Sequence, residues 1–267
     1  MTEILLHPGF HKTGTSSIQH FLWLNRAALA PHFTSVMLRH LKPAVQMACR
    51  FSRNRNPAEL MDMVAALDAA LAEAEVKPAQ NILVSCEGLL GHLPGWPDVD
   101  DYGAAPTLAA YLTGYFQDRH PKARLRVILT TRDADGWLFS TYRHHLRGQR
   151  LTQTPDDFAR TYAAAADLTG MAAQIADAVG DVPVFTLPLA DLAHYPLGPG
   201  GALCDLMQVP SATRGDLVAV GHGNTGPEQA LWEQFLALNR GPLGDRAVRA
   251  AKERLAEAVD LGGWRTA

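Results

Sequence analysis

The fold class is indicated first by residues 3–17, Glu3-Ile-Leu-Leu-His-Pro-Gly-Phe-His-Lys-Thr-Gly-Thr-Ser-Ser17. The start of this stretch, Glu3–His7, is apolar and predicts a short buried strand, and Pro8-Gly9 ends that strand in a turn. From Thr15 to about Leu29 the apolar residues recur at helical spacing. The chain therefore opens with a buried strand, a glycine-containing loop and a helix.

The same alternation of strand and helix continues along the chain. Two further apolar runs predict buried strands, Asn81–Ser85 and Leu125–Thr131, and Val182–Thr186 is a fourth strand candidate. The helices predicted between and after them are Pro57 to about Val76, Pro106 to about His120, Asp135–Gly148, a long helix that begins at Thr154-Pro155, and one that begins at the capping box Thr225–Glu228 and runs to about Asn239. Strands without polar alternation, separated by helices, predict an α/β fold of three layers, with a mostly parallel central sheet covered on both faces.

Length and composition agree with one domain over residues 1–267. The chain has a net charge of −3 and a pI of about 6.4, so we expect no nucleic acid and no membrane among its partners. Its three cysteines, Cys49, Cys86 and Cys204, are widely spaced and odd in number, which favours reduced thiols. With no secretory signal visible, we expect a cytoplasmic protein; oligomeric state is left open.

The opening loop has the chemistry of an anion site. Gly9 and Gly14 allow a close approach of the backbone, Lys12 offers a positive charge, and the following helix presents free N–H groups and the positive end of its dipole. The candidate phosphate-binding residues are Lys12, Thr13, Gly14, Thr15, Ser16 and Ser17. The loop is P-loop-like, but Lys12 precedes Gly14 and the chain contains no Gly-Lys pair, so a standard Walker A motif is absent.

The segment His7–Gln19 resembles the 5′-phosphosulfate loop of the sulfotransferase family, in particular bacterial members with a His-Lys-Thr-Gly-Thr core. The resemblance implies that 3′-phosphoadenylyl sulfate (PAPS) is the co-substrate. It also implies that Lys12 contacts the 5′-phosphosulfate and the leaving oxygen.

A second signature follows the strand Leu125–Thr131. Arg132 stands at the carboxyl edge of that strand and Ser140 lies eight residues further on, so an Arg–Ser pair is available for a second phosphate. The stretch Arg132–Arg143 resembles the family's 3′-phosphate motif, which carries that role over to Arg132 and Ser140. The family often has proline where this chain has Ala134.

Sulfuryl transfer needs a base opposite the leaving phosphate. Glu87 is the candidate, because it follows the strand Asn81–Ser85 at the same sheet edge and resembles the Ser-x-Glu placement of bacterial and carbohydrate sulfotransferases. His7, His11 and His92 are the competing bases.

Three functions remain open at this point. A sulfotransferase would act on a small-molecule or carbohydrate acceptor without a metal. A P-loop-type kinase would use the same loop with Mg²⁺, and a non-catalytic module would bind nucleotide or glycan without turnover. The acceptor pocket is expected from loops such as Gly91–Ala105 and Arg147–Thr154, which carry no motif.

Overall fold

The structure is a computed structural model that describes residues 1–192, 194–220 and 229–258 of the chain. Contacts between residues group the chain into two compact units. The first unit comprises Met1–Arg132 and Asp167–Gly223, and the second comprises Asp133–Ala166 and Asn224–Ala267. The predicted capping box Thr225–Glu228 lies outside the described residues. That the whole chain forms a single domain stays a prediction.

The first unit is built on a five-stranded sheet in which every pairing is parallel, as the apolar runs predicted. Its strands are β1 (Glu3–Gly9), β2 (Thr34–Met37), β3 (Ile82–Ser85), β4 (Arg124–Thr131) and β5 (Val184–Pro188). The strand order is β2-β3-β1-β4-β5, so β1 is central and its carboxyl end lies between those of β3 and β4.

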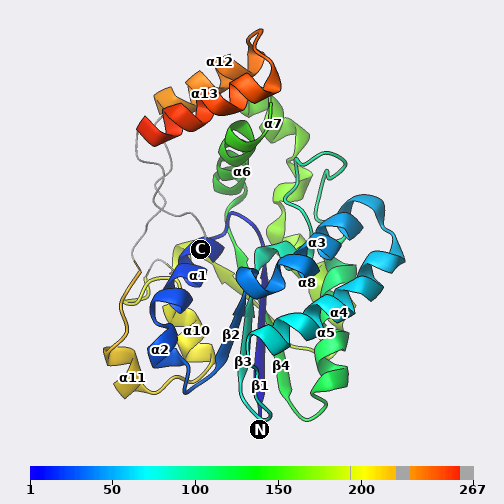
Figure 1. Ribbon diagram of the computed structural model, residues 1–267, viewed down its shortest axis with the longest axis vertical. Coiled ribbons are helices and arrows are strands. Elements are labelled where there is room, and N and C mark those ends of the chain that lie inside the picture. Colours follow the sequence, from blue (N-terminus) through cyan, green and yellow to red (C-terminus); the bar gives the residue numbers. More distant parts are fainter. Residues whose placement is uncertain (193, 221–228, 259–267) are drawn as a thin grey trace. The chain divides into compact units, whose positions relative to one another are not determined.

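Helices cover both faces of this sheet, which gives the expected three layers (Figure 1). One layer contains α1 (Thr15–Leu24), α2 (Arg26–Leu29), α10 (Gly201–Leu206) and α11 (Ser211–Gly215). The opposite layer contains α3 (Leu38–Asn54), α4 (Pro57–Glu73), α5 (Ala105–Arg119) and α8 (Leu168–Val179). Two short elements complete the unit: the 3₁₀ helix η1 (Glu87–Leu90) and α9 (Leu189–Leu192).

The core explains why the strands show no polar alternation. Leu5, Leu83 and Ile128 point from three adjacent strands into an apolar cluster with α1, α2 and α10. Successive side chains on a strand point to opposite faces, so Leu6 and Val84, which are also buried, lie on the other face. Both faces of β1, β3 and β4 are therefore buried, whereas β5 at the edge of the sheet is half-buried or exposed along its length.

The second unit is helical. Its elements are α6 (Ala134–Gly148), α7 (Pro155–Thr161), the 3₁₀ helix η2 (Ala164–Ala166), α12 (Gln229–Arg240) and α13 (Asp245–Ala258). Helix α6 packs against α7 and α12, and α12 packs against α13. Asp133 caps α6 by accepting a hydrogen bond from the Gly136 N–H at 2.7 Å.

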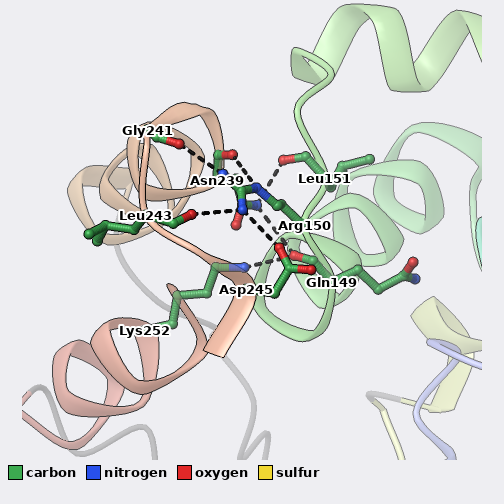
Figure 2. A network of polar contacts seen from close by, with 8 residues as sticks. All are labelled: Gln149, Arg150, Leu151, Asn239, Gly241, Leu243, Asp245 and Lys252. Carbon is green, nitrogen blue, oxygen red and sulfur yellow. Dashed lines mark hydrogen bonds and ion pairs between the residues drawn. The ribbon is translucent and has the colours of Figure 1, made fainter. Parts of the chain in front are cut away.

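Reciprocal capping of helix ends holds this unit together (Figure 2). The buried Lys252 of α13 donates to the carbonyl oxygens of Leu146 (2.6 Å) and Gln149 (2.7 Å) at the end of α6. Arg150, just beyond α6, donates to the Asn239 carbonyl at the end of α12 and to the Asp245 carboxylate at the start of α13. Cationic donors thus satisfy carbonyl groups that a helix leaves unpaired at its carboxyl end.

Two predicted helices differ from the structure. Thr154 caps a helix as expected, accepting from the Asp157 N–H at 3.1 Å, but the expectation of a long helix is wrong because α7 ends at Thr161. The helix predicted from Thr15 to Leu29 is interrupted at Asn25. The Asn25 amide forms two hydrogen bonds with the backbone of Val218, at 2.8 and 2.9 Å, and this tie fixes the break.

No helix in the described part of the chain is long and apolar enough to cross a membrane. All three cysteines are free thiols.

Candidate functional site

The site lies at a switch in the sheet topology. From β1 the chain turns toward β2 on one side of the sheet, whereas from the neighbouring β4 it continues to β5 on the other side. Ligands of open α/β sheets bind at the carboxyl edge at such a point. The Gly9–Ser17 loop, Glu87 and Arg132 follow β1, β3 and β4 respectively, so the first unit gathers these predicted site residues at one edge.

Glu87 is in direct backbone contact with the opening loop. A methyl group added to Gly9 would lie 3.1 Å from the Glu87 Cα and 3.2 Å from its carbonyl oxygen, and Gly9 has φ +130°. No other residue type fits both the contact and the backbone conformation without strain. The predicted base, Glu87, therefore packs directly against the predicted anion-binding loop.

A chain of buried hydrogen bonds supports the loop from below. The His7 imidazole joins β3 to β4, with Nδ1 2.8 Å from the Ser85 hydroxyl and Nε2 3.4 Å from the Thr130 hydroxyl. The Thr130 hydroxyl lies 2.6 Å from that of Thr13, which donates to the Phe10 carbonyl at 2.6 Å. All five of these residues are buried.

The donor and acceptor in each of these hydrogen bonds follow from the number of protons that each group carries. The single hydroxyl proton of Thr13 goes to Phe10, so Thr130 donates to Thr13 and accepts from His7 Nε2–H. His7 Nδ1 then accepts from Ser85. Burial lowers the pKa of His7 from 6.5 to about 4, opposed in part by the nearby Glu87 carboxylate, so the imidazole is neutral. Both nitrogens face protein groups, and His7 is therefore removed from the candidate bases.

Lys12 and Arg132 meet through the loop backbone. Lys12 has φ +65°, a left-handed conformation, and its carbonyl accepts a hydrogen bond from the Arg132 guanidinium at 3.3 Å. Both side chains are half-buried. The arginine expected at a 3′-phosphate is thus anchored to the residue expected at the 5′-phosphosulfate.

The remaining loop residues form the start of α1. Gly14 occupies the N-cap position with φ +92°, and as a glycine it has no side chain with which to cap the helix. Ser16 is exposed and Ser17 is half-buried, whereas Thr13 and Thr15 are buried. Because the Thr13 hydroxyl proton goes to Phe10, any contact of Thr13 with a phosphate would use its backbone N–H.

Gln19 links α1 to Glu87. Its side-chain Nε2 donates to Glu87 Oε2 at 2.7 Å. Gln19 lies four residues after Thr15, so the two share one face of the helix that follows the loop. The sequence alone indicates no role for Gln19, although its i, i+4 spacing from Thr15 places it on the helix face that begins at the loop.

Tyr102 fastens the irregular segment 91–104 to the opening loop. Its hydroxyl lies 3.2 Å from both the backbone nitrogen and Nδ1 of His11, and its ring packs against Phe10 at 4.9 Å between centroids. Burial raises the pKa of Tyr102, so the hydroxyl keeps its proton. Nothing local in the sequence identifies Tyr102, because it lies 91 residues from its partner. One ring nitrogen of the candidate base His11 is thus engaged by tyrosine.

The other predicted residues lie apart from these contacts. His92 packs against Trp96, with ring centroids 5.4 Å apart, and burial lowers its pKa. Ser140 is half-buried on α6 in the second unit, and its pairing with Arg132 stays a prediction. Within segment 147–154, Arg150 is held by the ends of α12 and α13. Among the described residues, no cluster of His, Cys, Asp and Glu could hold a metal ion.

Comparison with known proteins gives one structural similarity. No protein-family model matches the chain, and no curated protein matches it. A crystal structure of a sulfotransferase from Alicyclobacillus acidocaldarius is similar at 17% sequence identity and a TM-score of 0.49, with 100% of this chain and 99% of that chain covered. A similarity of this size assigns no function.

Proposed function

We propose that this protein is a sulfotransferase that transfers a sulfuryl group from PAPS to a hydroxyl or amine of a small-molecule or carbohydrate acceptor. The observation that carries the proposal is the backbone contact between Gly9 and Glu87, which sets a carboxylate beside the anion loop. The motif resemblance assigns the donor to that loop.

The proposed reaction is an in-line displacement. The acceptor oxygen or nitrogen forms a bond to sulfur while the bond from sulfur to the bridging phosphate oxygen breaks. Glu87 takes the acceptor's proton, and adenosine 3′,5′-bisphosphate leaves with the electron pair of the broken bond. Lys12 and the N-terminus of α1 stabilise the negative charge that develops on the leaving phosphate.

Arg132 is assigned to the 3′-phosphate, with Ser140 as its second ligand. A guanidinium binds phosphate through two parallel hydrogen bonds, and Arg132 is already anchored to the loop through the Lys12 carbonyl. The 3′-phosphate distinguishes PAPS from ATP, so a contact between Arg132 and this phosphate would be made in a sulfotransferase and not in a kinase.

Three free cysteines agree with a reducing compartment, and we expect the protein to act in the cytoplasm.

Calorimetric titration without metal tests this function. Adenosine 3′,5′-bisphosphate is expected to bind in preference to ADP and ATP. If ATP binds as well or better and requires Mg²⁺, the sulfotransferase proposal fails and a kinase takes its place. If the bisphosphate binds but no sulfuryl group reaches any of a panel of alcohols, phenols, amines and sugars, the protein is a non-catalytic module.

A further inference from the structure

Glu87 has its two carboxylate oxygens in different surroundings. Oε2 accepts the hydrogen bond from Gln19 at 2.7 Å. Within residues 1–192, 194–220 and 229–258, Oε1 of Glu87 has no hydrogen-bond or ion-pair partner. The residue is half-buried at the sheet edge and is therefore partly open to solvent.

We propose that Gln19 is a positioning residue for Glu87: its amide holds Oε2 and leaves Oε1 as the atom that takes the acceptor's proton. This inference rests on the proposed function, because it assigns a role to a neighbour of the proposed base. Gln19 itself touches neither the donor nor the acceptor in this assignment.

A neutral amide suits this task better than a charged donor would. A glutamate side chain has three rotatable bonds, and fixing them has an entropic cost that a hydrogen bond can offset. A lysine or arginine in the same place would also fix the carboxylate, but its positive charge would stabilise the ionised form and weaken the base. Gln19 orients the carboxylate and leaves its charge uncompensated.

The location of Gln19 ties the base to the donor. Helix α1 begins at Thr15, directly after the anion loop, and Gln19 lies one turn further along the same face. On the other side, the backbone of Glu87 packs against Gly9 of the same loop. Glu87 therefore contacts residues on both sides of the loop, Gly9 before it and Gln19 after it. A displacement of the loop would move the carboxylate in the same direction.

Turnover of Gln19→Leu tests the inference, with Gln46→Leu as the matched control because Gln46 is exposed on α3. With the best acceptor of the panel, we expect kcat to fall by roughly 10²-fold, a loss that a misplacement of about 1 Å can cause. Binding of adenosine 3′,5′-bisphosphate should not change. In a Glu87→Gln background, Gln19→Leu should have no additional effect on kcat, because the two residues act as one unit. Equal losses of kcat in both backgrounds would mean that Gln19 has only a structural role.

A second measurement needs no acceptor. The side-chain amide of Gln19 gives an NMR signal that Gln19→Leu identifies by its loss. We expect this signal to move in Glu87→Gln. If Glu87→Gln leaves the signal in place, the positioning role is wrong even when sulfuryl transfer is found. If the signal moves but Glu87→Gln turns over like the wild type, the assignment of the base fails instead.

Discussion

His7 Nδ1 lies 2.8 Å from the Ser85 hydroxyl, and this contact places a neutral imidazole between β1 and β3 directly beneath the anion loop. Because His7 also reaches Thr130 on β4, one side chain joins the three strands whose carboxyl ends carry the site. A protonated His7 would have two donors, and Ser85 would have to reverse its hydrogen bond. The hydrogen bonds beneath the candidate site therefore require that His7 is uncharged.

The stability of the protein should fall in acid partly because of His7. Its pKa is about 4 in the folded protein and 6.5 when unfolded, so between these values the unfolded chain binds more protons. Stability is complete above about pH 6.5 and is lost as the pH falls toward 4, by roughly 3 kcal/mol from this residue. Urea unfolding of the wild type and of His7→Gln, across this pH range, measures the effect.

The variant keeps a polar side chain but cannot ionise, so its stability relative to the wild type should improve as the pH falls. Four other histidines have a lowered pKa and are present in both proteins: His20, His40, His92 and His120. The difference between the two proteins therefore isolates His7. A difference that stays constant with pH would show that His7 does not resist protonation.

Gly9→Ala should disturb the contact between the loop and Glu87. The added methyl would press on the Glu87 backbone, and alanine at φ +130° is strained, so we expect a loss of roughly 1–3 kcal/mol in stability together with weaker bisphosphate binding. Gly114→Ala is the control. No atom lies within 4 Å of a methyl group added at Gly114, which is within α5, so this change should stabilise the protein by about 0.5–1 kcal/mol. Equal effects of the two substitutions on unfolding and binding would contradict a close backbone contact between Gly9 and Glu87.

Glu87→Gln should lower kcat by about 10²–10⁴-fold while leaving bisphosphate affinity nearly intact, because the amide keeps the shape of the side chain but accepts no proton. Single-turnover transfer from labelled PAPS, measured beside calorimetric binding, separates the two quantities. Unchanged turnover would exclude Glu87 and return attention to His11 or His92.

Arg132→Ala should remove the preference for a 3′-phosphate. Loss of a charge-assisted bidentate contact is expected to weaken adenosine 3′,5′-bisphosphate binding by about 10- to 100-fold, with little effect on ADP. Because Arg132 also donates to the Lys12 carbonyl, ADP is the necessary control for damage to the loop. Weakening of both nucleotides to the same extent would make Arg132 a support of the loop and not a phosphate ligand.

The sequence predicted those elements whose own residues encode them. β1, β3, β4 and β5 are short apolar runs bounded by polar or turn residues, and each formed a strand within a few residues of the expected ends. β2 was missed because Thr34-Ser-Val-Met37 has only two apolar residues. It is a strand because it pairs with β3 from Thr34 to Met37, and such a partner cannot be identified from local composition.

The site shows the same limit. The loop and Arg132 have local signatures, and both lie at the predicted sheet edge. Their hydrogen bond at 3.3 Å joins residues 120 apart in sequence, and no spacing rule predicts it. Tyr102 and Thr130 likewise become part of the site only through side-chain contacts made in the fold.

Lys252→Met should destabilise the second unit. The lysine Nζ is a donor to the carbonyls of Leu146 and Gln149, so its loss leaves the end of α6 without these hydrogen bonds and should cost about 1–3 kcal/mol. Burial, followed by the charge of Arg150, lowers the pKa of Lys252 from 10.5 to about 8. Between these two values the unfolded chain binds more protons, so the wild type should gain stability as the pH rises from about 8 to 10.5, and the variant should lack this gain.

Hydrogen exchange of α6 amides in both proteins measures the stability of this helix end, with the exposed Lys122→Met as the control. If Lys252→Met exchanges like the wild type at every pH, Lys252 does not secure the end of α6, and the Arg150 contacts with α12 and α13 must hold the unit without it.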